Sequence, residues 1–222
     1  MFIVFEGIDG AGKTAQIHLL QARLAARAPS LVVLHEPGGT ALGDEIDRLV
    51  KHLPEISLTA EAELLLFLAS RTQLVQGVIR PALLDKKIVL CDRFASSTVA
   101  YQGFGRGLDL KVVQQLLDFS TGGLTPDITI LLNVPVRVGL KRKAAEGVVR
   151  TDAFQLSMFE PAAYDRFHDE EAEFHERVGE GYLKLAAAAQ SNPAAGRWVI
   201  IDGTPDPEAV SERIWATIEP IL

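Results

Sequence analysis

Cysteine is nearly absent from this 222-residue sequence: Cys91 is the only one, so no intrachain disulfide can form. A chain without disulfides is typical of proteins that work in the reducing cytoplasm, which is the location we expect. Apolar runs of about 18 residues, the length that crosses a membrane, are also missing. The start, MFIVFEGIDG, lacks the basic segment and small-residue cleavage site of a signal peptide and instead predicts a strand.

Positive charge is in short supply as well, because 22 Lys and Arg stand against 29 Asp and Glu, a net charge of −7. This balance excludes a protein that binds nucleic acid through a broad basic face, and nothing in the sequence indicates a membrane partner. The basic residues are unevenly spread, however: positions 137–150 contain five of them and only one acid, Glu146. A local excess of this kind suits a small anionic ligand.

No repeat, low-complexity tract or Pro/Gly/Ser-rich linker divides the chain, so we expect a single domain over residues 1–222. Five short apolar runs predict strands at 2–6, 31–35, 88–92, 127–134 and 198–202. Helical patterns lie between them, at 13–28, 43–52, 60–84, 110–120, 136–145, 172–189 and 208–218. This alternation predicts a three-layer α/β fold with a five-stranded parallel sheet, whose ligand binds beyond the carboxyl ends of the strands.

The segment after the first predicted strand is a phosphate-binding loop (P-loop), matching G-x-x-x-x-G-K-[ST]. It reads Gly7-Ile8-Asp9-Gly10-Ala11-Gly12-Lys13-Thr14. Its glycines allow backbone angles that turn successive N–H groups towards phosphate oxygens, and a helix N-terminus follows. We expect these eight residues to bind ATP, Lys13 to bridge the β- and γ-phosphates, and Thr14 to ligate Mg²⁺. The loop does not identify the second substrate.

Two further segments concern that second substrate. Asp92 and Arg93 end the third predicted strand, where Asp92 can reach Mg²⁺ through water and Arg93 can clamp a phosphate. Taken alone, these two residues fit a simple ion pair equally well. Phe67 and Arg71 lie four residues apart, hence on one helix face, and would stack on a nucleobase and read its edge. Taken alone, Phe67 fits core packing better than ligand binding.

Five segments of the sequence share an order and spacing with a known family. They are the P-loop, Glu36-Pro37-Gly38-Gly39-Thr40, Phe67-Leu68-Ala69-Ser70-Arg71, Asp92-Arg93-Phe94 and Ala100-Tyr101-Gln102-Gly103. In this they resemble bacterial thymidylate kinase, a P-loop nucleoside monophosphate kinase, and the resemblance continues to Gly181-Tyr182. It implies a P-loop NTPase fold with a basic lid, transfer of the γ-phosphoryl of MgATP to dTMP to give dTDP and ADP, and a homodimer.

The resemblance also implies roles at single positions. Phe67 is similar to the residue that stacks on thymine, and Arg71 to the residue that reads its exocyclic oxygen. Tyr101 is similar to the ring under the sugar that disfavours a 2′-hydroxyl, and Asp9 to the carboxylate that contacts the 3′-hydroxyl. The other residues expected around dTMP are Arg93 and Arg48 at its phosphate, Gln102 at the base or sugar, and Glu36, Ser97 and Thr98.

A lid is expected at about 137–166, because the P-loop contains no arginine and the resemblance implies a lid arginine in its place. Arg142 matches that arginine, and Asp165-Arg166-Phe167 resembles a D-R-x motif that usually follows sooner. The long gap indicates an insertion near 147–164, and leaves Arg142, Arg150 and Arg166 as candidates for contacting the transferring phosphoryl. A solvated helix face is the alternative for this basic stretch. The residues expected to be catalytic are Lys13, Asp9, Arg93, Arg142 and Arg166.

The expected nucleophile is a phosphate oxygen of dTMP, whose second pKa near 6 leaves it mostly dianionic at neutral pH, so no general base is required. One alternative is another nucleoside monophosphate or deoxynucleoside kinase. A P-loop GTPase-type switch is disfavoured because the sequence has no N-K-x-D guanine-reading segment. An inactive P-loop scaffold is disfavoured because Lys13, Thr14, Asp92 and Arg93 are all present.

Overall fold

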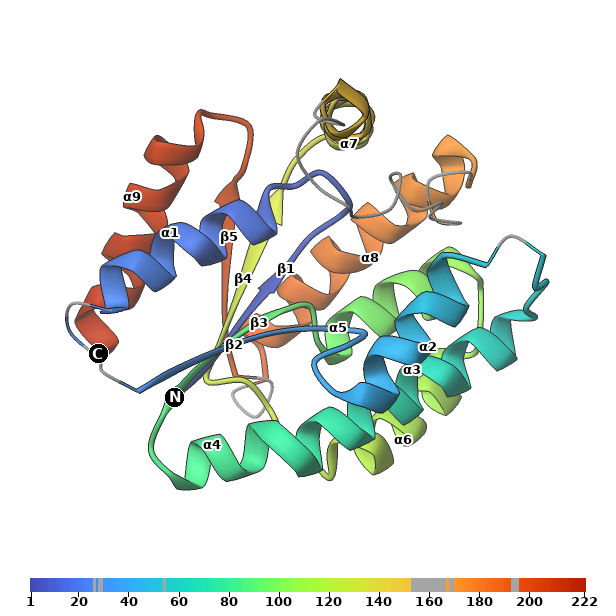
Figure 1. Ribbon diagram of the computed structural model, residues 1–222, viewed down its shortest axis with the longest axis horizontal. Coiled ribbons are helices and arrows are strands. Elements are labelled where there is room, and N and C mark those ends of the chain that lie inside the picture. The colour runs from blue at the N-terminus through green and yellow to red at the C-terminus, as the bar shows by residue number, and fades with distance from the viewer. Residues whose placement is uncertain (26, 28–29, 54, 153–166, 168–169, 193–195) are drawn as a thin grey trace.

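The computed structural model describes residues 1–222 except 26, 28–29, 54, 153–166, 168–169 and 193–195 (Figure 1). Five strands form one parallel sheet in the order β2-β3-β1-β4-β5, which confirms the predicted fold class. The strands are β1 Phe2–Glu6, β2 Leu31–His35, β3 Ile88–Asp92, β4 Ile128–Asn133 and β5 Arg197–Asp202. Their predicted ends differ from these by no more than one residue.

Helices cover both faces of the sheet. In Figure 1, α1 Lys13–Ala25 and α9 Pro207–Ile218 lie on one side, while α3 Ala60–Leu74, α6 Leu110–Thr121 and α8 Ala172–Gln190 lie on the other. Because successive side chains of a strand point to opposite faces, β1 contributes to two cores.

The two cores share β1 between them. Ile3 packs in the same cluster as Ile17 of α1, while Val4 packs with Leu74 of α3. All five residues of β1 are buried, which explains why this strand reads as an uninterrupted apolar run ending in one acid, Glu6.

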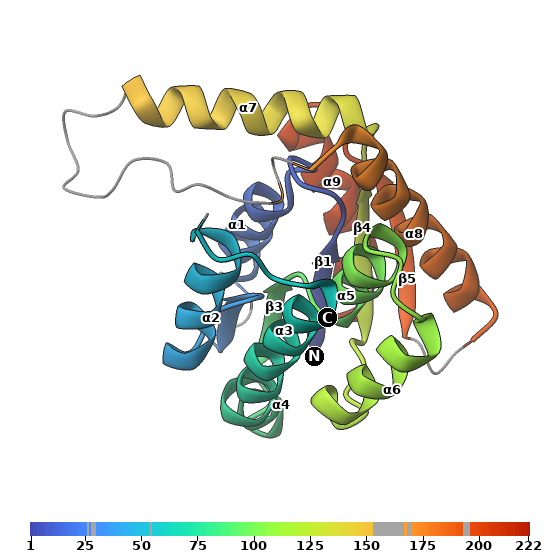
Figure 2. The same ribbon diagram turned by 90° about the vertical axis from the view of Figure 1, so that its right-hand side faces the viewer.

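The carboxyl ends of three strands meet at one edge of the sheet. Asp92 at the end of β3 is in register with Phe5 of β1 on one side and with His35 of β2 on the other. The loops that leave these strands therefore converge. Figure 2 shows α7 Val136–Asp152 crossing above this edge.

The helix predicted at 60–84 contains a π-helical segment, η1 Val75–Ile79, between α3 and α4 Arg80–Leu84. Pro81 has no N–H to donate to the preceding turn, so the ladder widens just before it, and Arg80 N–H bonds to Val75 O instead. The short helix α5 Ala95–Thr98 and the π-helix η2 Val99–Gly105 were not predicted. The remaining elements are α2 Ala41–Lys51 and η5 Glu219–Ile221.

Helix α7 is longer than the predicted 136–145, because it continues to Asp152. The insertion expected near 147–164 therefore begins inside this helix, and its positions from 153 onwards lie outside the described residues. Among the helices that the structure describes, none combines the length and the apolar character needed to span a membrane.

Candidate active site

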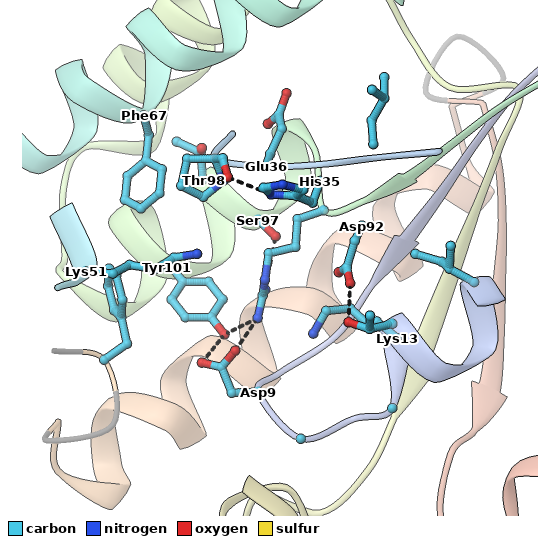
Figure 3. A pocket seen from close by; sticks show the side chains of 18 of the residues that line it. Asp9, Lys13, His35, Glu36, Lys51, Phe67, Asp92, Ser97, Thr98 and Tyr101 are labelled. Atoms are coloured by element: carbon cyan, nitrogen blue, oxygen red, sulfur yellow. Dashed lines mark hydrogen bonds and ion pairs between the residues drawn. The ribbon is translucent and has the colours of Figure 1, made fainter. Parts of the chain in front are cut away.

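A cavity of about 460 Å³ opens at the converging strand ends (Figure 3). Its walls come from the P-loop, α1, the ends of β2 and β3, α3, η2 and α7. Lys13 and Asp92 lie at one end of it, and Phe67 and Tyr101 lie at the other. The expected site residues that line it are Asp9, Gly10, Gly12, Lys13, Thr14, Glu36, Phe67, Arg71, Asp92, Arg93, Ser97, Thr98, Tyr101 and Gln102.

The P-loop connects β1 to α1 and wraps around the side chain of its own lysine. The Lys13 ammonium donates to Gly7 O at 3.1 Å and to Ile8 O at 3.0 Å. Burial lowers the pKa of Lys13 to about 8, and Arg93 acts in the same direction. A buried cation held by neutral carbonyls is only partly compensated, so this end of the cavity favours an anionic ligand.

Gly10 has no room for a side chain. Its φ is +71°, and a Cβ there would come within 2.0 Å of Gly139 O in α7. The P-loop therefore packs directly against the first turn of α7, the helix that begins the stretch predicted to be a lid.

Thr14 and Asp92 offer oxygen atoms next to the P-loop. The Thr14 hydroxyl donates to Asp92 Oδ2 at 2.7 Å, joining the first turn of α1 to the end of β3. A hydroxyl and a carboxylate are ligands that suit Mg²⁺, so this pair fits the metal expected with ATP. No cluster of three or more His, Cys, Asp or Glu side chains with metal-binding spacing occurs in the part of the chain that the structure describes.

Arg93 donates hydrogen bonds to several side chains that line the cavity. Its Nη2 donates to Asp9 Oδ1 at 2.5 Å and to Tyr101 Oη at 3.0 Å, and Nη1 donates to Ser97 Oγ at 3.2 Å. Its backbone adopts φ +71°, a left-handed conformation that costs a non-glycine residue about 1–3 kcal/mol. The many hydrogen bonds hold it there, and strain of this kind is commonly found at functional sites.

Asp9 is charged in this arrangement. Burial alone would raise the pKa of Asp9, but Arg93, with smaller effects of Lys13, Lys143 and Lys51, brings it well below its usual range. Tyr101 Oη also donates to Asp9 Oδ2 at 3.1 Å (Figure 3). Asp9 and Arg93 thus form a partly buried ion pair at the middle of the cavity.

Glu6, which the sequence analysis missed, accepts hydrogen bonds from residues that contact Arg93. Its carboxylate is fully buried and accepts from Phe94 N, from Ser97 N and Oγ, and from Tyr182 Oη, at 2.6–3.2 Å. Burial raises the pKa of Glu6, opposed by the Ser97 hydroxyl. Since Ser97 and Tyr182 also accept from Arg93, Glu6 orders the ligands of the guanidinium. Glu6 could have been recognised in the sequence as an acidic residue at the end of an otherwise apolar strand.

The opposite end of the cavity is aromatic. Phe67 packs at 6.1 Å from the ring of Phe167, which stands perpendicular to Tyr101 at 5.8 Å. Arg71 lies behind this wall and is only 2% exposed. It donates to Glu36 Oε2 at 2.6 Å and to Thr98 Oγ1 at 2.7 Å. These partners fix the guanidinium where it borders the cavity.

Two expected arginines do not line the cavity. Arg48 is exposed on α2 and pairs with Glu45 at 3.2 Å, whereas Lys51, one turn further on, lines the cavity. Arg142 donates to the backbone oxygens of Gly203 and Thr204, in the loop between β5 and α9, at 2.8 and 3.0 Å.

Among the described residues of α7, Lys143, next to Arg142, lines the cavity. The sequence analysis singled out neither Lys51 nor Lys143. The side chain of Arg150 and the whole of Arg166 lie outside the described residues.

Comparisons with known proteins agree with this geometry. Residues 5–214 match the family model described as "Thymidylate kinase". The chain is 46% identical over 202 residues to a thymidylate kinase of Geotalea daltonii, covering 91% of this chain and 88% of that protein. It is 45% identical over 222 residues to one of Desulfovibrio desulfuricans, covering 100% and 96%. The crystal structure of thymidylate kinase from Ehrlichia chaffeensis superimposes with a TM-score of 0.71 at 33% identity, covering 98% of both chains.

Proposed function

This chain belongs to the thymidylate kinase family, and from that membership we propose how its cavity carries out the reaction. The protein is an ATP-dependent kinase that phosphorylates dTMP. One observation carries the assignment of this reaction to the cavity: a complete P-loop and a wall suited to a nucleobase face the same space. The family also favours this reaction over the other kinases, the GTPase-type switch and the inactive scaffold considered above.

ATP binds with its phosphates on residues 7–14, where the backbone N–H groups and the Lys13 ammonium face them. Thr14 would ligate Mg²⁺ directly and Asp92 would hold it through water, and the bound ion would neutralise phosphate charge. Lys13 turns from Gly7 O and Ile8 O to the β- and γ-phosphates, so a buried cation exchanges neutral partners for anionic ones.

dTMP occupies the other part of the cavity. Phe67 stacks on thymine, Arg71 reads an exocyclic oxygen, and Tyr101 lies under the sugar, close to Asp9. Arg93 clamps the acceptor phosphate, while Glu36, Ser97 and Thr98 hold Arg71 and Arg93 in place. On α2, Lys51 is the better-placed cation for this phosphate, since Arg48 is paired with Glu45 outside the cavity.

The phosphate oxygen of dTMP attacks the γ-phosphorus as ADP leaves, and no protein group needs to take up a proton. Catalysis rests on alignment and on neutralising the transferring charge. Lys13 of the P-loop, Arg93 after β3 and Lys143 of α7 supply the positive charge for this. Arg166 remains the proposed lid arginine for the phosphoryl, whereas Arg142 holds the loop after β5, on the donor side.

The protein works as a homodimer in the cytoplasm. Support for the dimer comes from apolar side chains that neighbouring helices expose: Leu65 of α3 is 57% exposed, and Val112 and Phe119 of α6 are 50% and 84% exposed. Exposed apolar side chains on adjacent helices suit an interface between identical copies. The chain acts as one domain with its lid at about 137–166.

A coupled assay of ADP release across dTMP, dUMP, dGMP, dCMP, AMP and thymidine tests the function. We expect dTMP to be the best acceptor, dUMP weaker and thymidine inactive. Efficient phosphorylation of AMP in preference to dTMP would contradict the proposal, and acceptor-independent GTP hydrolysis would indicate a switch.

A further inference from the structure

A buried carboxylate lies behind the nucleobase end of the cavity. Glu63 on α3 is only 2% exposed, so its charge needs several hydrogen-bond donors. Arg106 supplies two, from Nε to Oε1 at 3.2 Å and from Nη2 to Oε2 at 3.0 Å. Gln102 supplies another, from Nε2 to Oε1 at 2.8 Å.

The contact with Glu63 decides which way the Gln102 amide points. A side-chain amide has a donor end and an acceptor end, whereas a carboxylate paired with a guanidinium only accepts. The Nε2 end must therefore face Glu63. Gln102 also lines the cavity, and no residue that the structure describes donates to its Oε1. The acceptor end is thus left for the ligand.

Arg106 keeps this arrangement rigid. Its Nη1 donates to Glu170, and its guanidinium lies 4.7 Å from the ring centroid of Phe174 and 5.6 Å from that of Phe167. Turning the Gln102 amide over would place its carbonyl against the Glu63 carboxylate, two acceptors with no hydrogen between them.

We infer that Glu63 is a positioning residue for base selection: it fixes Gln102 with its carbonyl towards the cavity and so favours a pyrimidine whose N3 carries a hydrogen. Thymine and uracil have N3–H, which donates to such a carbonyl, whereas N3 of cytosine is an acceptor and meets it unpaired. Glu63 therefore separates dTMP and dUMP from dCMP, without separating dTMP from dUMP. The inference rests on the proposed binding of dTMP in this cavity.

Glu63→Gln tests the inference. Arg106 Nη2 will hold the new carbonyl at the position of Oε2, where it is the donor. The new NH₂ group then takes the position of Oε1, loses the hydrogen bond from Arg106 Nε and donates to Gln102, whose amide turns its own NH₂ to the cavity. We expect KM for dTMP to rise roughly 10- to 100-fold with kcat changed less than about threefold. The ratio of kcat/KM for dTMP to that for dCMP should fall at least about tenfold.

The matched control is Glu170→Gln, which removes the other charged partner of Arg106 but does not touch Gln102. Its dTMP-to-dCMP ratio should stay within about twofold of wild type. If Glu170→Gln lowers the ratio as much as Glu63→Gln, loss of charge on Arg106 explains the effect and the inference is wrong.

An exchange of the two side chains adds a rescue. In Glu63→Gln/Gln102→Glu, the amide at 63 donates to the carboxylate at 102, whose second oxygen again offers an acceptor to the base. We expect the dTMP preference to return to within about threefold of wild type, which a purely structural role of Glu63 would not produce. If Glu63→Gln alone does not fold by circular dichroism, this double variant decides: a folded protein without dTMP preference overturns the inference.

An assay of the wild-type enzyme distinguishes failure of this inference from failure of the proposed function. Wild type that phosphorylates dTMP beside a folded Glu63→Gln with an unchanged ratio refutes only the role of Glu63. Wild type that does not phosphorylate dTMP refutes the proposed function, and this inference with it.

Discussion

Replacing Lys13 by methionine should stabilise the ligand-free protein while it abolishes catalysis. Lys13 is 7% exposed, and burial lowers its pKa from 10.5 to about 8. Each pKa unit corresponds to about 1.4 kcal/mol, so keeping this charge in the folded state costs about 3 kcal/mol. Methionine has a similar length and no charge, so the variant Lys13→Met avoids that cost.

Part of the gain is lost with the hydrogen bonds to Gly7 O and Ile8 O, each worth about 0.5–1.5 kcal/mol net. The expected net effect is a free energy of unfolding higher by up to about 2 kcal/mol at pH 7, and a Tm higher by up to about 8 °C for a chain of this size. In contrast, kcat should fall by roughly a hundred- to ten-thousandfold, because the variant lacks the positive charge that neutralises the transferring phosphoryl group.

The stability gain of Lys13→Met depends on pH, in a direction that follows from the lowered pKa of Lys13. Below pH 8, Lys13 is charged in both the folded and the unfolded state, and the burial cost is complete. Between pH 8 and 10.5 the folded state releases its proton first, so the cost declines as the pH rises. The stability advantage of Lys13→Met should therefore be greatest at pH 7 and smaller at pH 9.5.

Urea unfolding of the nucleotide-free proteins at pH 7 and pH 9.5 measures this difference. Lys141→Met, at an exposed position of α7, is the control and should change the free energy of unfolding by less than about 0.5 kcal/mol. A Lys13→Met protein less stable than wild type at pH 7, or an advantage that does not shrink at pH 9.5, would refute the reasoning.

Four other substitutions test different parts of the molecule. Phe67→Ala should raise KM for dTMP roughly 5- to 100-fold, the loss of one base stack, with folding checked by circular dichroism; an unchanged KM would return Phe67 to core packing. Arg142→Ala should raise KM for ATP roughly 3- to 30-fold because the loop after β5 loses two hydrogen bonds, while Arg166→Ala should lower kcat roughly ten- to a thousandfold with little change in KM for dTMP. If Arg142→Ala instead lowers only kcat, Arg142 reaches the phosphoryl after all. Phe119→Glu should convert dimers to monomers in light scattering after size exclusion without lowering Tm, and a dimer that persists would place the interface elsewhere.

The sheet could be predicted closely from the sequence because strands covered on both faces are continuous apolar runs with clear ends. β1 is the example, with five buried residues followed at once by the P-loop motif. The P-loop was predictable for a different reason: its chemistry is local, and eight consecutive residues contain all of it.

Contacts between distant positions could not be predicted. Glu6 and Tyr182 are 176 residues apart, and neither has a local pattern that announces the other. Which face of α7 is turned to the cavity could not be predicted either. Arg142 and Lys143 are neighbours, and successive residues of a helix point about 100° apart, so only one of them faces the cavity. A basic stretch with no apolar stripe gives no indication of which one.

The π-helix η2 restricts which insertions and deletions the protein can tolerate. Seven residues, Val99–Gly105, carry Tyr101 and Gln102 into the cavity on a turn wider than that of an α-helix. Deleting one codon there would close the turn to ordinary α-helical geometry and rotate one side of the segment by about 100° relative to the other. The resulting protein would have almost the same composition and hydrophobicity, yet the side chains proposed to contact sugar and base would point elsewhere. Shuffled or shortened variants of this enzyme should therefore tolerate few length changes within this turn.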